Sequence, residues 1–344
     1  MLLAARGRRI ATAAAFGGGG LTLLGAGTVA LLYLQAKLAH RAVGFTEWQR
    51  PRVRRVYGEG EGPPISFALL GDSTAAGFAL TEGPLTPGVL LAEGIAAVAD
   101  RPVRLRNMSV VGAVSADLDS QLDRLRGAPV DVAVVFIGAN DVIRLTRPAD
   151  SADHLRGAVR RLRAGGAEVV VATCPDLGSV RPIGWPLRSV ARRASRRLAA
   201  AQTVAVVEAG GRTVSLTDLL ADEFWARPEE LFGPDRFHPS ARGYAAAASV
   251  VLPSACVALG LLPELEEAEE APEEVLPVHR AAAAAVDRPG TEVSGTEVAG
   301  RERGPLGRWA MLLRRRPEAP AEQVPAAAGA GSPTPGGDLE DGTG

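Results

Sequence analysis

The chain has 344 residues, a formal net charge of −1 and a hydrophobic fraction of 47%. This length accommodates one catalytic domain with additional segments, because single domains typically contain about 100–200 residues. The balanced charge gives no reason to expect nucleic acid as a partner, and two cysteines exclude a disulfide framework. Cys174 and Cys256 stand in apolar stretches and are expected to be buried thiols. Neither they nor the four histidines have the spacing of a zinc site, so no metal is expected.

The N-terminal part of the chain indicates a membrane anchor. Residues 1–9 are basic, and residues 10–34 form an almost uncharged apolar stretch, long enough for a bilayer span of about 20 residues. An uncleaved signal anchor is favoured over a cleaved signal peptide, whose apolar region usually has about 7–15 residues. The arginines before the stretch favour a cytoplasmic N-terminus, whereas the larger number of positive residues after it points the other way. A large following domain can be translocated despite its charges. We expect a single-pass protein of the cell membrane, with a linker over residues 35–65 and an extracytoplasmic domain.

Residues 66–261 alternate short apolar runs with helical patterns. The predicted strands are Ser66–Leu70, Val103–Asn107, Asp131–Ile137, Glu168–Thr173 and Val204–Val207. This alternation is typical of βαβ units, and the run at Asp131–Ile137 lacks the period of two of a half-exposed strand. It predicts an α/β fold: a three-layer α/β/α sandwich with a mainly parallel, flavodoxin-like five-stranded sheet. Pro253 is expected to kink or divide the last helix, Ser240–Leu259.

The remaining chain, residues 262–344, begins with an acidic run and continues rich in Ala, Pro and Gly. Such a composition predicts a disordered tail, because it offers little apolar surface to bury. Within it, Leu306–Arg316 joins apolar residues to three arginines. This segment is interpreted either as a short helix that binds a membrane surface or a partner, or as an apolar patch in a linker.

Four short blocks carry the residue types of a serine hydrolase. They are Gly71-Asp72-Ser73-Thr74, Asn107-Met108-Ser109-Val110-Val111-Gly112, Gly138-Ala139-Asn140-Asp141 and Asp235-Arg236-Phe237-His238-Pro239. The first three follow predicted strands, and ligands bind beyond the carboxyl ends of the strands in an open parallel sheet. Ser73 offers a hydroxyl nucleophile, and Asp235 stands at a spacing that lets it bond His238 and leave the other ring nitrogen free as a base. Alone, each block has an ordinary interpretation as a turn or a helix cap.

In this order the four blocks resemble the SGNH, or GDSL, hydrolase family over Ser66–Leu261. The resemblance implies a catalytic triad of Ser73, His238 and Asp235. It also implies an oxyanion hole made by the backbone N–H groups of Ser73 and Gly112 and by the side chain of Asn140. The expected activity is hydrolysis of carboxylic esters, such as lipid, short acyl or O-acetyl esters, without a cofactor. An O-acyltransferase with the same triad and a non-catalytic binding or scaffold protein are the alternatives.

Four aromatic residues are candidates for substrate binding: Trp185, Phe224, Trp225 and Phe232. Packing of the Asp235–His238 loop is an equally good interpretation for the last three. A helix near 186–200 carries five arginines on one face, which indicates either a solvated surface or attraction to anionic lipid. The oligomeric state is left open by the sequence.

Overall fold

The computed structural model describes residues 28, 30–38, 41, 48–180, 182–216, 228–263, 274–304 and 307–314. Most of the predicted signal anchor, and the candidates Phe224 and Trp225, lie outside the described residues. Residues 30–38 are helical, so the helix continues past the predicted end of the anchor at residue 34.

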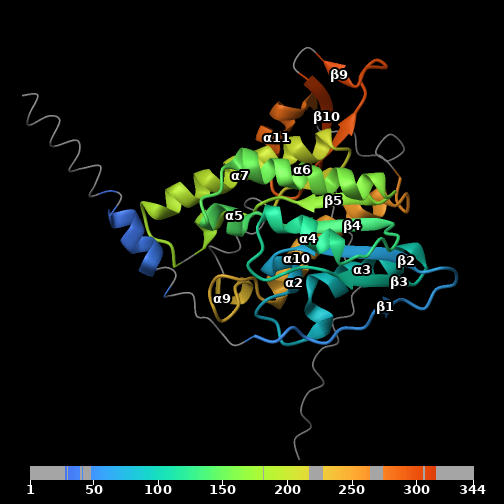
Figure 1. Ribbon diagram of the computed structural model, residues 1–344, viewed down its shortest axis with the longest axis horizontal. Helices are drawn as coiled ribbons and strands as arrows, with labels where there is room; N and C mark the ends of the chain where they lie inside the picture. The colour runs from blue at the N-terminus through green and yellow to red at the C-terminus, as the bar shows by residue number, and fades with distance from the viewer. Residues whose placement is uncertain are drawn as a thin grey trace, which may run out of the picture.

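A parallel five-stranded sheet forms the centre of the domain, as the sequence predicted (Figure 1). Its strands, in spatial order, are β3 (Val103–Asn107), β2 (Ile65–Gly71), β4 (Val132–Phe136), β5 (Glu168–Ala172) and β6 (Arg212–Val214). The register pairs Gly71 with Phe136 and Leu69 with Asn107, so that β2, β3 and β4 end beside one another. β1 (Val56–Tyr57) pairs antiparallel with β3 inside the predicted linker, which therefore joins the domain.

Helices cover both faces of this sheet, which gives three layers. α3 (Pro87–Ala99) and α10 (Ala241–Ala258) pack on the face that buries Phe67 and Leu69 of β2. α4 (Leu118–Asp123) and α6 (Pro148–Ala164) pack on the face that buries Ala68 and Leu70. Alternate residues of one strand are therefore buried on opposite faces, which explains why the strands read as continuous apolar runs. The short elements are α2 (Ser73–Ala76), η1 (Gly83–Leu85), η2 (Ser115–Asp117), α5 (Ala139–Ile143), η3 (Leu177–Ser179) and α9 (Pro228–Leu231).

The prediction of a strand at Val204–Val207 was wrong, because these residues form the last turn of helix α7 (Leu187–Glu208). Val206 and Val207 are buried in two different apolar clusters, and this packing outweighs the weak preference of β-branched residues for strands. The fifth strand is the short β6, which follows the turn at Gly210 and Gly211.

Helix α10 is not divided, because Pro253 lies buried inside one continuous helix. Among the described helices, α10 is the one with the length and hydropathy of a membrane span, and 61% of it is buried in the protein. That burial is expected of a core helix in a three-layer domain.

The predicted disordered tail is corrected in part, because elements within residues 274–304 and 307–314 extend the sheet (Figure 1), while residues 264–273, 305, 306 and 315–344 lie outside the described residues. The added elements are β7 (Glu274–Pro277), α11 (Val278–Val286), β8 (Thr291–Thr296), β9 (Arg303–Gly304) and β10 (Gly307–Arg314). β8 pairs antiparallel with β6, and β10 pairs with β8, so the segment at 306–316 contains a strand instead of a helix. Apolar residues of α11 and β10 pack against Val207 of α7 and form a buried cluster. The averaged composition of the tail gave no sign of this cluster.

Candidate active site

Ser73 is the first residue of α2, immediately beyond the end of β2. The turn requires Gly71, whose φ is +129° and whose absent Cβ would lie 1.8 Å from the carbonyl oxygen of Phe136. Asp72 caps the helix, since its Oδ1 accepts the N–H of Thr74 at 2.8 Å. This turn places the Ser73 hydroxyl at the carboxyl edge of the parallel sheet.

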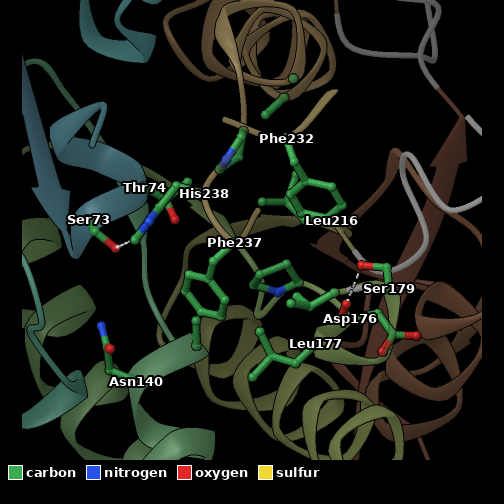
Figure 2. A pocket seen from close by; sticks show the side chains of 16 residues that line it. Ser73, Thr74, Asn140, Asp176, Leu177, Ser179, Leu216, Phe232, Phe237 and His238 are labelled. Carbon is green, nitrogen blue, oxygen red and sulfur yellow. Dashed lines mark hydrogen bonds between the residues drawn. The ribbon is translucent and has the colours of Figure 1, made fainter. Parts of the chain in front are cut away.

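Ser73, His238 and Asp235 form a continuous hydrogen-bonded chain, and Figure 2 shows its Ser73–His238 half. The Oγ of Ser73 lies 2.9 Å from Nε2 of His238, and Nδ1 of His238 lies 2.5 Å from Oδ2 of Asp235. When Nδ1 carries the proton and donates it to Asp235, Nε2 is left to accept the serine hydroxyl proton. The structure therefore brings together the three residues that the sequence singled out, across 165 positions of chain.

The Asp235 carboxylate is fixed from several sides. It is 1% exposed, and its Oδ1 accepts the backbone N–H groups of Phe237 and His238 at 3.0 Å each. Burial alone would raise the pKa of Asp235, but the hydrogen bonds from His238 and from the Phe237 backbone outweigh it and hold the pKa below its ordinary value. The carboxylate thus stays ionised and oriented toward the imidazole.

Asn140 faces the same pocket as Ser73 and His238 (Figure 2). Its Nδ2 donates to the carbonyl of Ala113 at 3.0 Å. An amide nitrogen carries two hydrogens, so one bond to Ala113 leaves a second donor. Gly112 directly precedes Ala113 and has a φ of +80°, and its carbonyl accepts from Arg144 at 2.8 Å. Gly112 does not line the pocket itself, but the next residue, Ala113, accepts the hydrogen bond from Asn140.

Two further buried carboxylates, Asp72 and Asp141, lie beside the site, although no role was predicted for them. Asp141 accepts the N–H of Ser115 and, at 2.7 Å, the hydroxyl of Ser151, which joins the third block to the loop of the second. Burial raises the pKa of Asp72 to about 6, and the hydrogen bonds of Thr74 oppose this rise only in part. Their places directly beside Ser73 and Asn140 were the signal available in the sequence.

The pocket beside Ser73 is mainly apolar (Figure 2). Phe232, Phe237 and Leu216 line it, together with Leu177 and the polar residues Asp176 and Ser179. Phe232 thus lies where the sequence predicted a substrate-binding residue. Phe237 was missed as a lining residue, and its ring meets the His238 ring edge-on at 4.9 Å between centroids.

Trp185 does not line this pocket, and its side chain is 78% exposed. Its backbone carbonyl accepts a hydrogen bond from Gln35 of the helical segment 30–38. A substrate contact predicted for Trp185 is therefore not supported by this geometry.

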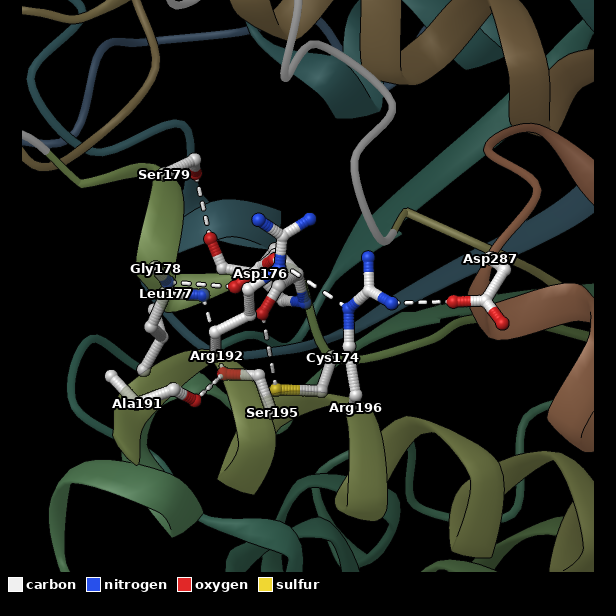
Figure 3. Close-up of polar contacts among 11 residues, drawn as sticks. Cys174, Asp176, Leu177, Gly178, Ser179, Ala191, Arg192, Ser195, Arg196 and Asp287 are labelled. Atoms are coloured by element: carbon white, nitrogen blue, oxygen red, sulfur yellow. Dashed lines mark hydrogen bonds and ion pairs between the residues drawn. The ribbon is translucent and has the colours of Figure 1, made fainter. Parts of the chain in front are cut away.

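The arginine-rich face of α7 is partly turned inward (Figure 3). Nε of Arg192 lies 3.1 Å from Oδ2 of Asp176, and Arg196 joins both Asp176 and Asp287. Arg193 and Arg197 are exposed, as predicted for a solvated face, and Arg192 remains half-exposed, whereas Arg196 is more buried. The ion pairs hold one end of the pocket against α7.

No group of three or more His, Cys, Asp or Glu residues suited to a metal occurs in the described part of the chain. Cys174 and Cys256 are buried thiols, as predicted.

The sequence of residues 69–246 matches the GDSL-like Lipase/Acylhydrolase family. A GDSL-like esterase of Mycobacterium tuberculosis is 39% identical over 328 residues, which cover 92% of this chain and 96% of that protein. Among solved structures, the acetylxylan esterase Axe2 from Geobacillus stearothermophilus is 18% identical with a TM-score of 0.45, over 58% of this chain and 95% of that one. LAE5, an alpha/beta hydrolase enzyme from the metagenome of Lake Arreo, is 19% identical with a TM-score of 0.44, over 58% of this chain and 97% of that one. From the family match and the similarity to the mycobacterial esterase along nearly its whole length, the chain belongs to the GDSL-like lipase/acylhydrolase family of carboxylic ester hydrolases.

Proposed function

We propose that this chain is a membrane-tethered serine esterase that hydrolyses carboxylic esters through an acyl-enzyme on Ser73. The observation that carries the proposal is the chain of hydrogen bonds from Ser73 through His238 to Asp235. A hydroxyl is a weak nucleophile at its free pKa, and a base at hydrogen-bond distance is what activates it.

In the first half of the reaction, Oγ of Ser73 attacks the ester carbonyl carbon while Nε2 of His238 takes the hydroxyl proton. Asp235, which accepts from Nδ1, stabilises the imidazolium that forms. His238 then protonates the leaving alkoxide, the alcohol departs, and the acyl group remains on Ser73. Water repeats the sequence with the acyl-enzyme and releases the carboxylic acid.

The oxyanion formed in each half-reaction needs donors beside Ser73. We assign this role to the backbone N–H groups of Ser73 and Gly112 and to Nδ2 of Asn140. The place of Asn140 in the wall of the Ser73 pocket supports the assignment. One such donor typically contributes about 3–4 kcal/mol of transition-state stabilisation.

The acyl group is proposed to enter the apolar pocket between Phe232, Phe237 and Leu216. Lipid esters, short acyl esters and O-acetyl esters all offer an acyl group that an apolar wall accommodates. A chain-length series therefore serves to distinguish these substrate classes.

Membrane tethering is proposed from the apolar stretch at residues 10–34. The helical segment 30–38 supports it, because Gln35 donates to the carbonyl of Trp185 at 2.6 Å and accepts the N–H of Leu187 at 3.1 Å. These bonds hold the end of the proposed anchor against the amino-terminal end of α7. We further propose that the domain lies outside the cytoplasm.

Hydrolysis of a p-nitrophenyl ester series by the detergent-solubilised full chain tests the chemistry. We expect turnover that is abolished in Ser73→Ala and retained in Ser249→Ala, a serine of α10 whose Oγ bonds the carbonyl of Ala246. A burst of p-nitrophenol equal to the enzyme concentration and a fluorophosphonate adduct at Ser73 are expected for an acyl-enzyme mechanism. A folded protein that neither hydrolyses any ester nor forms the adduct would refute the proposal.

Fractionation of cells that produce the full chain tests the tether. We expect the protein to stay with membranes after carbonate extraction and to become soluble when residues 1–34 are deleted. Protease added outside intact cells is expected to cleave the domain, whereas complete protection would contradict the proposed orientation.

A further inference from the structure

Trp48 reaches the proposed catalytic histidine through one intervening ring. Its indole Nε1 donates to the carbonyl of Leu80 at 2.7 Å, and its ring lies 5.0 Å from the Phe78 ring between centroids. Phe78 in turn lies 4.4 Å from the imidazole of His238. The backbone carbonyl of Phe78 accepts from the buried hydroxyl of Tyr244 at 3.0 Å, so Phe78 is held from two sides. Trp48 therefore forms the outer layer of the packing against one face of the imidazole.

Two residues further along the same segment, Arg50 reaches the helix that carries Ser73. Its Nη2 donates to the carbonyl oxygen of Ser109 at 2.8 Å and to the Ser109 hydroxyl at 3.2 Å. The Ser109 hydroxyl bonds Oδ1 of Asn107 at 2.5 Å, and Nδ2 of Asn107 donates to the carbonyl of Ala75 at 3.1 Å. Ala75 lies in α2, two residues after Ser73. Arg50 is thus linked by hydrogen bonds to the backbone that presents the nucleophile.

We propose that Trp48 and Arg50 form a clamp that positions the nucleophile and the base relative to each other. Trp48 acts on His238 through Phe78, and Arg50 acts on the α2 turn through Ser109 and Asn107. Both are positioning residues, because neither lines the pocket beside Ser73. The clamp rests on the proposed function, because it matters only if Ser73 and His238 react together.

The geometry explains why such a clamp is useful. The Ser73 and His238 side chains come from opposite ends of the domain sequence, and each stands on a short loop or a four-residue helix. A displacement of about 1 Å between reacting groups can lower a rate by about a hundredfold. One segment that touches the surroundings of both side chains limits their relative displacement.

Full-chain variants in detergent test the clamp, with the rate of fluorophosphonate labelling of Ser73 and the kcat and KM for p-nitrophenyl acetate as readouts. Trp48→Leu and Arg50→Met are each expected to lower the labelling rate and kcat at least about tenfold, with KM within about twofold of the original value. Trp48→Phe retains a ring against Phe78, and Arg50→Lys retains a donor. Both are therefore expected to keep most of the labelling rate and kcat of the original protein. Arg52→Met, at an exposed position of the same segment, is the matched control.

A double-mutant cycle separates the proposed route from a general loss of stability. In a Phe78→Leu background, Trp48→Leu is expected to have less effect on kcat than in the original protein, because its route to His238 is already removed. Thermal unfolding of each variant shows whether it is folded at the assay temperature. If Trp48→Leu and Arg50→Met are labelled as fast as the original protein, the clamp is refuted. If the original protein itself is not labelled and hydrolyses no ester, the proposed function fails instead.

Discussion

The substitution Asp72→Asn is predicted to stabilise the protein increasingly as the pH rises. Asp72 is 2% exposed and lies between β2 and Ser73, where burial raises its pKa from the ordinary 3.8 to about 6. A carboxyl whose pKa is raised on folding contributes stability while it is protonated, below pH 3.8, and loses that contribution as the pH rises through about 6. The amide of asparagine does not ionise and retains an oxygen that accepts the Thr74 N–H.

The size of the effect follows from the two pKa values. The difference between about 6 and 3.8 corresponds to about 3 kcal/mol in total, since one pKa unit corresponds to about 1.4 kcal/mol. About half of this is already lost at pH 5, where the carboxyl of the unfolded chain is ionised. The stability of Asp72→Asn relative to the original protein is therefore expected to rise by about 1 kcal/mol between pH 5 and pH 7.5.

Urea unfolding of both proteins at the two pH values measures this difference. Asp119→Asn removes an exposed carboxylate of α4 and controls for the change in surface charge. If the relative stability of Asp72→Asn is the same at pH 5 and pH 7.5, the Asp72 carboxyl is not desolvated as the structure indicates, and the reasoning is refuted.

Three other substitutions test the turn, the oxyanion donor and the added strands. Gly71→Ala is expected to lower the free energy of unfolding by more than about 4 kcal/mol, because its Cβ would overlap the carbonyl of Phe136; a thermal transition near that of the original protein would contradict this. Asn140→Ala is expected to lower kcat about 10²- to 10³-fold at nearly constant KM in steady-state ester hydrolysis, and an equal rise in KM would argue for a role in ground-state binding. Glu292→Ala is expected to lower the free energy of unfolding by about 3 kcal/mol in urea, since the 1% exposed Glu292 pairs with Arg212 at 3.0 Å; a change below about 1 kcal/mol would mean that the pair is not desolvated.

The proposed catalytic residues could be predicted from the sequence because parallel topology brings the ends of strands together. Ser73 follows β2, and Asn140 follows β4, which is the direct neighbour of β2 in the sheet. His238 follows no strand of the sheet, but its spacing from Asp235 is local and therefore visible in the sequence. In contrast, the contacts of Trp48 and Arg50 depend on the path of a segment without periodicity across the domain. No local sequence pattern predicts that path.

The errors in the fold share one physical cause, which is that tertiary packing decided between two local possibilities. Val204–Val207 has the residue types of a strand, but it continues α7 because two apolar clusters bury its valines. Segment 274–314 has the composition of a linker when it is averaged with its surroundings. Its β8 joins the central sheet by pairing with β6, about 80 residues earlier, and such long-range pairing is not encoded in neighbouring residues.

The C-terminal strands have a consequence for the pocket. β8 begins at Thr291, whose carbonyl accepts the N–H of Ser215, and the N–H of Gly290 donates to the carbonyl of Ser215 at 2.9 Å. Leu216, the next residue, lines the pocket beside Ser73. Asp287, just before β8, pairs with Arg196, which also joins the pocket residue Asp176. One wall of the proposed acyl pocket is therefore held by the segment that composition alone assigned to a disordered tail. This segment belongs to the catalytic domain, and a chain that ended at Leu261 would leave the edge of β6 and the backbone before Leu216 without these hydrogen bonds.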